Sequence, residues 1–168
     1  MRIENIHLNG SAVIDPSSNI NNIELGDGVK IARRCSVYGS AESILTVGEN
    51  SYIGMNSVIN GYHAKVTIGS NVSIAQNVII MADSGPNASP QLQKIFPIQI
   101  APVNIGNHSW IGAAAVIMPG VHLGKYCIVA ANSFVSDSFE DYSVIGGSPA
   151  RLLKKLDPLD LAMDTTHE

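Results

Sequence analysis

The chain has 168 residues, with 10 Lys and Arg against 14 Asp and Glu, which gives a formal net charge of −4. The length fits one domain, and the charge excludes a generally basic nucleic-acid-binding protein. Hydrophobic residues make up 45% of the chain and charged residues 14%, which is too apolar for a disordered protein.

No apolar run reaches the roughly 18 residues that a membrane span needs, and the first residues lack the apolar stretch of a secretory signal. The two cysteines, Cys35 and Cys127, are too few for a disulfide framework, and their spacing matches no zinc site. We therefore expect a cytoplasmic protein that does not span a membrane.

Branched aliphatic residues indicate a fold built from strands. The chain has 21 Ile and 14 Val but only 10 Leu, and the stiff Ile and Val side chains pack well on pleated strands. The 15 Gly and 14 Asn indicate many tight turns, because both residues tolerate a positive φ. This composition predicts an all-β protein with little helix before the last twenty residues.

Aliphatic residues recur every six positions along most of the chain. The longest unbroken series is Ile105, Ile111, Ile117, Leu123, Val129 and Val135. A short strand with one inward aliphatic, followed by a turn and repeated every six residues, makes a flat-sided coil. Three such sides close one turn of a parallel β-helix. A β-sandwich with coincidental spacing is the alternative, and six consecutive matches at one period argue against it.

The period breaks most strongly between Ile80 and Ile105, where prolines and polar residues accumulate. We expect a β-helix domain over residues 1–150, with a projecting loop inserted around residues 82–102. Residues 151–168 are expected to form a C-terminal helical tail that caps the open edge of the coil.

Three pieces of the repeat resemble hexapeptide-repeat acyltransferases, in particular bacterial sugar and polysaccharide O-acetyltransferases. They are Trp-Ile-Gly-Ala at 110–113, Met-Pro-Gly-Val at 118–121 and Gly-Gly-Ser-Pro-Ala-Arg at 146–151. The resemblance implies a left-handed parallel β-helix that assembles as a homotrimer and binds acetyl-CoA in the clefts between subunits. It also implies acetyl transfer to a sugar hydroxyl in cell-surface polysaccharide biosynthesis.

The same resemblance assigns six residues to the coenzyme A site: Trp110, Ala113, Ala131, Ser136, Arg151 and Lys154. Trp110 would border both the pantetheine arm and the acceptor, and the two alanines would let the arm approach the backbone. The two cations would meet the phosphates of the cofactor, because guanidinium and ammonium groups bind phosphate. Each of these residues also has a purely structural explanation. Trp110 could pack at a corner, the alanines could be required by the turns, and the cations could lie on an exposed helix face.

A hydroxyl acceptor needs a general base beside it. Sugar-specific relatives carry a histidine in the projecting loop, but the loop here reads MADSGPNASPQ and contains none. Asp83 falls near that position, with Ser84 and Asn87 placed to position the substrate; burial would have to raise its pKa from about 3.9. His63 is the other candidate, because a histidine pKa of about 6.5 suits base chemistry.

Two further alternatives remain open. The acceptor could be the neutral amine of a nucleotide-linked amino sugar, which needs no base, or the chain could be an inactive trimeric interaction module. No metal is expected: a zinc enzyme of this fold uses three histidines, and the spacing of His108 and His122 does not place both on one face.

Overall fold

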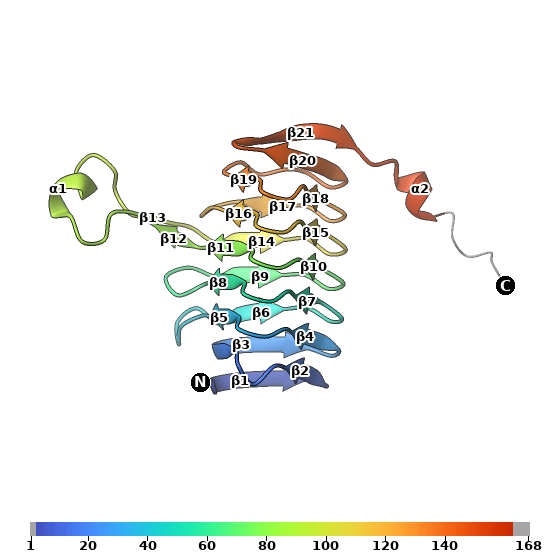
Figure 1. Cartoon of the computed structure of the whole chain (residues 1–168), viewed down its shortest axis with the longest axis horizontal. Helices are drawn as coiled ribbons and strands as arrows, with labels where there is room; N and C mark the ends of the chain where they lie inside the picture. The colour runs from blue at the N-terminus through green and yellow to red at the C-terminus, as the bar shows by residue number, and fades with distance from the viewer. Residues whose placement is uncertain (1–2, 163–168) are drawn as a thin grey trace.

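Each six-residue step of the sequence folds into one short strand followed by a turn (Figure 1). The computed structural model describes residues 3–162. Strands that lie one turn of the coil apart pair in parallel, so the strands of successive turns form three stacked sides. The predicted all-β parallel β-helix, with a projecting loop and a short C-terminal helix, is confirmed.

The three sides are named here A, B and C. Side A contains β1 (Ile3–Asn9), β3 (Asn19–Gly26), β6 (Leu45–Val47), β9 (Val66–Ile68), β14 (Val103–Ile105) and β17 (His122–Leu123). Side B contains β2 (Ala12–Ile14), β4 (Val29–Ile31), β7 (Tyr52–Ile53), β10 (Ser73–Ile74), β15 (Trp110–Ile111), β18 (Ile128–Val129), β20 (Ser143–Gly147) and β21 (Ala150–Lys155). Side C contains β5 (Ser36–Tyr38), β8 (Val58–Asn60), β11 (Ile79–Met81), β16 (Val116–Ile117) and β19 (Phe134–Val135).

Strand β3 joins sides C and A, because its first half pairs with β5 and its second half with β6. The bend between the two halves lies at Asn22, which has a φ of 50°. Asparagine reaches this left-handed conformation more easily than most residues, because its short polar side chain bonds locally.

The core is a column of aliphatic side chains in parallel register. On side B the inward residues of successive turns are Ile31, Ile53, Ile74, Ile111, Val129 and Ile145, each at most 2% exposed. Stacking of β-branched residues at the strand spacing removes nearly all of this surface from water, and this burial is the main stabilising contribution to the fold.

Extra residues enter the coil at one corner, the C–A corner, where side C passes to side A. They are residues 39–44, 61–65 and 82–102, in three successive turns. The last insertion projects as a loop whose stem is the antiparallel pair β12 (Asp83–Ser84) and β13 (Gln99–Ile100). Its outer part carries α1 (Pro90–Gln93) (Figure 1). The corner therefore collects segments that lie far apart in the sequence.

The predicted helical tail over residues 151–168 is wrong in its first part. Residues Ala150–Lys155 form β21, which pairs antiparallel with β20 through the turn at 148–149. This pairing satisfies the backbone groups that the last coil strand would otherwise leave open at the edge of side B. The helix is limited to α2 (Pro158–Ala162), and residues 163–168 lie outside the described residues. Within residues 3–162, no helix is long and apolar enough to cross a membrane.

The column makes a prediction about stability. Ile74 is fully buried between Ile53 and Ile111, so Ile74→Ala should lower the free energy of unfolding by about 3 kcal/mol through lost burial and a cavity. Ser73→Ala, on the outward face of the same strand, should change it by less than about 0.5 kcal/mol. Urea unfolding at one fixed protein concentration measures both, and equal effects would contradict a column that depends on inward packing.

Candidate active site

The C–A corner brings His63 and Asp83 together. His63 lies in the turn after β8, and Asp83 follows β11 at the start of the projecting loop. Because β8 and β11 pair in parallel, their ends meet at this corner, and His63 Nδ1 lies 3.0 Å from Asp83 Oδ2. The sequence presented these residues as alternative bases, whereas the structure makes them hydrogen-bonded partners.

The Asp83 carboxylate is held in place from two directions. Its backbone pairs with Ile100 in the loop stem, and its side chain is only 14% exposed, against 54% for His63. Asn60 Nδ2 donates to the same carboxylate oxygen at 3.2 Å. Asn60 Oδ1 accepts the backbone N–H of Tyr62 at 2.9 Å, which fixes the orientation of the amide. The carboxylate is thus ordered, while the imidazole stays accessible.

This geometry specifies what the imidazole can do. An ionised Asp83 only accepts hydrogen bonds, so the neutral His63 tautomer that fits carries its proton on Nδ1. That leaves the Nε2 lone pair available to take a proton from a bound group. The Tyr62 ring meets the imidazole edge-on, with ring centroids 4.9 Å apart and planes at 86°, and limits its rotation.

Sequence reasoning missed Asn60 and Tyr38. Tyr38 directly follows the inward Val37, and Asn60 directly follows the inward Ile59. Tyr38 and Asn60 are paired in register on side C. Burial first, and then the negative charge of Asp83, raise the pKa of Tyr38. The six-residue repeat could have identified both residues, because the position after an inward aliphatic at this corner faces the inserted loops.

The other two residues predicted for this site occupy different positions. Ser84 is half-buried beside Asp83 in β12. Asn87 is exposed further along the loop, where its backbone N–H donates to the Gly85 carbonyl at 2.9 Å. Asn87 therefore belongs to the outer loop rather than to the stem that carries the carboxylate.

Trp110, Ala113 and Ala131 line one apolar hollow of about 500 Å³ beside the corner between sides B and C, named here the B–C corner. Trp110 points outward from β15 and is 54% exposed. The two alanines come from successive turns, and Gln76 borders the hollow from the turn before them. The structure thus joins three of the six residues that the resemblance assigned to coenzyme A.

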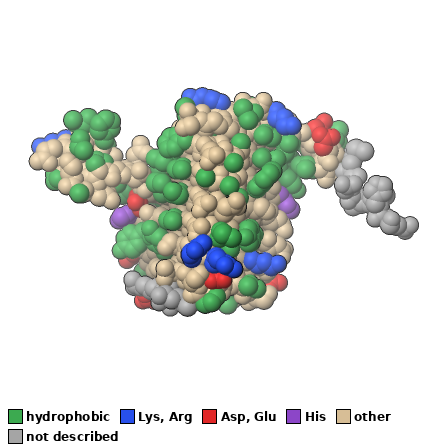
Figure 2. Space-filling view, viewed as in Figure 1, with side chains coloured by type: hydrophobic (Ala, Val, Ile, Leu, Met, Phe, Trp, Pro, Cys, Tyr) green, Lys and Arg blue, Asp and Glu red, His purple; other side chains and the backbone are tan. Residues whose placement is uncertain are grey.

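The remaining three lie apart from this hollow. Ser136 is at the C–A corner, where it lines a separate hollow with Pro119 and the loop stem. Arg151 and Lys154 are exposed on β21, above the last turn, where Figure 2 shows basic side chains at the top of the molecule. Arg151 Nη1 lies 3.4 Å from Asp137 Oδ2, a contact between two exposed groups that contributes little to stability.

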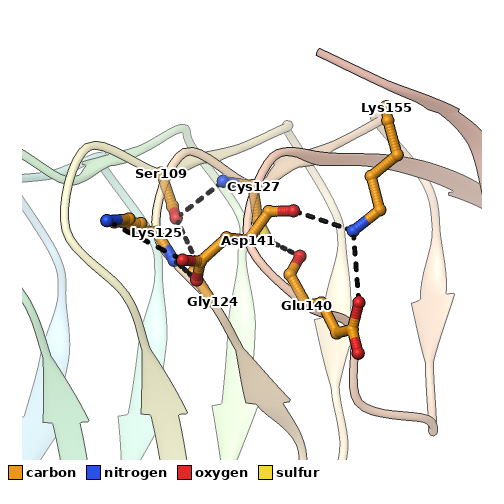
Figure 3. Close-up of polar contacts among 7 residues, drawn as sticks. All are labelled: Ser109, Gly124, Lys125, Cys127, Glu140, Asp141 and Lys155. Atoms are coloured by element: carbon orange, nitrogen blue, oxygen red, sulfur yellow. Dashed lines mark hydrogen bonds and ion pairs between the residues drawn. The ribbon is translucent and has the colours of Figure 1, made fainter. Parts of the chain in front are cut away.

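Neither cysteine is placed as a nucleophile. Burial raises the pKa of both Cys35 and Cys127, which disfavours the reactive thiolate. Figure 3 shows Cys127 inside a network of backbone contacts, with its thiol donating to the Glu140 carbonyl at 3.2 Å. These thiols act as small core residues.

Two other exposed histidines also lie away from the pair. His108 stacks on Tyr126 with ring centroids 4.7 Å apart, and His122 points outward from side A. Within residues 3–162, no group of three or more His, Cys, Asp or Glu side chains is arranged to hold a metal ion.

Comparison with known proteins finds hexapeptide repeats in two segments of the coil. Residues 102–137 match the family described as bacterial transferase hexapeptide (six repeats), and residues 44–82 match the hexapeptide repeat of succinyl-transferase. The galactoside O-acetyltransferase of Escherichia coli is 34% identical over 125 residues, covering 74% of this chain and 60% of that protein. A putative lipopolysaccharide biosynthesis O-acetyl transferase of the same species is 32% identical over 114 residues, covering 63% and 56%.

Among solved structures, a variant of AntD, an N-acyltransferase from Bacillus cereus in complex with dTDP-4-amino-4,6-dideoxyglucose and coenzyme A, shares the fold. Its TM-score is 0.79 at 23% identity, and the match covers 96% of this chain and 87% of that chain. Two segments of the chain thus carry hexapeptide repeats of the transferase type, and the chain is similar to sugar O-acetyltransferases over about three quarters of its length. It spans about three fifths of the length of the galactoside O-acetyltransferase.

The pair predicts an observable titration. In protein labelled with ¹³C at Cζ of tyrosine, Tyr38 should ionise above the usual pKa of about 10, because burial and Asp83 both disfavour the phenolate. Asp83→Asn removes the negative charge and should lower the pKa of Tyr38, while leaving the contribution of burial in place. NMR titration measures both, and a Tyr38 pKa that does not move would show that the carboxylate does not face this ring.

Proposed function

We propose that this protein transfers an acetyl group from acetyl-CoA to a hydroxyl of a sugar acceptor, in the formation of a cell-surface polysaccharide or its precursor. The observation that carries the proposal is the His63–Asp83 pair at 3.0 Å, which supplies the base that a hydroxyl acceptor needs. The named activities of the sugar O-acetyltransferases that it matches support the same reaction.

In the proposed mechanism, Nε2 of His63 removes the proton of the acceptor hydroxyl as its oxygen attacks the thioester carbonyl. Asp83 stabilises the resulting imidazolium through the Nδ1 hydrogen bond. The tetrahedral intermediate then collapses, the C–S bond breaks, and the imidazolium returns its proton to the leaving thiolate. The products are the acetyl ester and free coenzyme A, and the protein itself carries no covalent intermediate.

The geometry also argues against the two alternatives, an amine acceptor and an inactive interaction module. An amine acceptor would need no base, so the ordered imidazole–carboxylate pair favours a hydroxyl. An inactive module would not need a carboxylate held by both Asn60 and His63. Substrate positioning falls to Ser84 in the stem and to Asn87 in the outer loop. Trp110, at the B–C corner, would border an acceptor held by a neighbouring subunit.

The hollow at the B–C corner is the proposed place of the pantetheine arm of acetyl-CoA. It is apolar, and its alanines leave the backbone open to a ligand that needs close approach. Arg151 and Lys154 on β21 would bind the phosphates of the cofactor. Ser136, at the C–A corner, would contact the cofactor held by a neighbouring subunit. Two buried free thiols fit a reducing compartment, so we place the reaction in the cytoplasm.

The acting form in this proposal is a homotrimer. Outward residues of side C form an apolar row in register: Val58, Ile79, Val116 and Phe134. Val58 and Ile79 are each 37% exposed, although they lie on the flat face of a strand. The row is continuous over four turns, and a second copy of the chain would bury it.

The role of the His63–Asp83 pair as general base is tested by single substitutions. His63→Gln should lower kcat about 100-fold or more because no group then accepts the hydroxyl proton, and Asp83→Asn should lower it less because the imidazole is kept but loses its charged partner. His122→Gln, another exposed histidine, is the matched control and should leave kcat unchanged. Thiol release from acetyl-CoA with a panel of sugars and nucleotide sugars is the assay. Full turnover by His63→Gln would favour the amine alternative.

The assembly is tested separately by light scattering. The wild-type mass should be near three times the 17.8 kDa of one chain. Ile79→Asp should give monomers, because it places a charge in the apolar row on side C. Thr67→Asp makes the same kind of change on the outward face of side A and should remain trimeric. A monomeric wild type would rule out the homotrimer.

A further inference from the structure

Three cations gather on the lower turns of this acidic chain. Lys30 points outward from β4, and Arg33 and Arg34 form the turn that follows it at the B–C corner; all three side chains are exposed. Figure 2 shows basic side chains grouped on this face at the level of β4, far from those at the top of the molecule. The proposed reaction leaves this cluster without a role.

Among the residues that the structure describes, the cluster carries no ion pair of its own. Within residues 3–162, no carboxylate lies within ion-pair distance of Arg33 or Arg34. The charge of Arg33 is felt at Asp15, but that carboxylate is bonded to Ser17 through both its backbone N–H and its hydroxyl. The positive potential of these three side chains is therefore available to an external anion.

Arg34 occupies a backbone position that suits asparagine better. Its φ is 57°, and the equivalent residues of later turns are Asn56, Asn77, Ala114 and Asn132, all between 58° and 60°. A left-handed conformation costs residues other than Gly and Asn about 1 kcal/mol, so arginine here lowers the stability of the turn. Arginine therefore adds a conformational cost that asparagine would not, although Ala114 shows that this corner also accepts other residues.

The guanidinium of Arg34 is also held in place. Its Nε donates to Asn56 Oδ1 at 3.0 Å, and its backbone N–H donates to Ser17 Oγ at 2.9 Å. No described residue bonds the two terminal nitrogens, so they can form a two-pronged contact. A planar, preorganised fork of this kind matches the oxygens of a phosphate.

The position relates the cluster to the proposed active site. Arg34 precedes β5, and Tyr38 ends β5 beside Asn60 and the His63–Asp83 pair. Four residues of strand, at about 3.3 Å each, separate the two ends by about 13 Å along side C. A sugar at His63 and a diphosphate attached to it can bridge this gap on a single chain.

We infer that Arg33 and Arg34, with Lys30, bind the diphosphate of a nucleoside-diphosphate-linked sugar whose sugar hydroxyl is the acceptor at His63. The inference rests on the proposed function, because it names the acceptor class of the same site. The shared chemistry is a phosphorylated nucleotide, which coenzyme A also offers, so the test must separate the two sources. The proposed coenzyme site is separate from this cluster, because the apolar hollow begins two turns further along the coil and Arg151 lies beyond it.

The test is calorimetric titration of the full chain with inorganic pyrophosphate, UDP, dTDP and coenzyme A, which requires no turnover. Arg34→Asn should weaken binding of pyrophosphate and of the preferred nucleoside diphosphate about tenfold or more, and leave coenzyme A binding unchanged. Because asparagine occupies this corner in later turns, the variant should keep or raise the thermal midpoint.

Two matched variants complete the design. Arg151→Gln should weaken coenzyme A binding and leave pyrophosphate binding unchanged, and Lys94→Gln, an exposed cation on the projecting loop, should change neither. Failure of the wild type to bind nucleoside diphosphates, or Arg34→Asn weakening only coenzyme A, would overturn the inference. If diphosphates bind through Arg34 but no acetyl transfer follows with any acceptor, the proposed reaction fails instead, so the two failures are distinguishable.

Discussion

The parallel stacking of inward aliphatic side chains is the constraint on which the rest of this structure depends. Each turn must place Ile, Val or Leu over the same residue type of the turn below, as Ile53, Ile74 and Ile111 do on side B. Extra residues therefore enter only between strands, where they do not disturb this register. The three insertions lie at the C–A corner, where they leave the column unchanged. Because they stack on one another in successive turns, their polar side chains, including His63 and Asp83, come together there.

This arrangement explains how two residues that are twenty positions apart, His63 and Asp83, form the proposed hydrogen-bonded catalytic pair. His63 follows the inward Ile59, and Asp83 follows the inward Ile80, which is directly paired with Ile59 in the next turn. The column fixes the spacing of the two backbones, and the side chains of Asn60 and Tyr62 then set the orientation of the carboxylate and the imidazole. The rigid repeat supplies the positions, and the inserted residues supply the functional groups.

The six-residue period predicts the column and the place of the projecting loop, because both depend on local spacing alone. It does not predict the contact between His63 and Asp83, since the insertions before and after β8 break the count from which register would be read. The sequence predicted a helical tail over residues 151–168, whereas residues Ala150–Lys155 form β21. Their pairing with β20 is a long-range requirement of the open edge, and no local pattern reports it.

Residues other than Gly and Asn occupy several corner positions with a positive φ, and their contacts differ from one corner to another. Where side A passes to side B, the positions are Gly28, Asn50, Asn71, His108, Tyr126 and Tyr142. The last three fit the conformation less well, but their rings stack at 4.7 and 5.3 Å, so packing within the chain offsets the cost. Among the described residues of the B–C corner, no such ring stack compensates Arg34, and its free guanidinium nitrogens face solvent. Its hydrogen bonds to Asn56 and Ser17 instead order an exposed side chain, which is the arrangement that a binding residue needs.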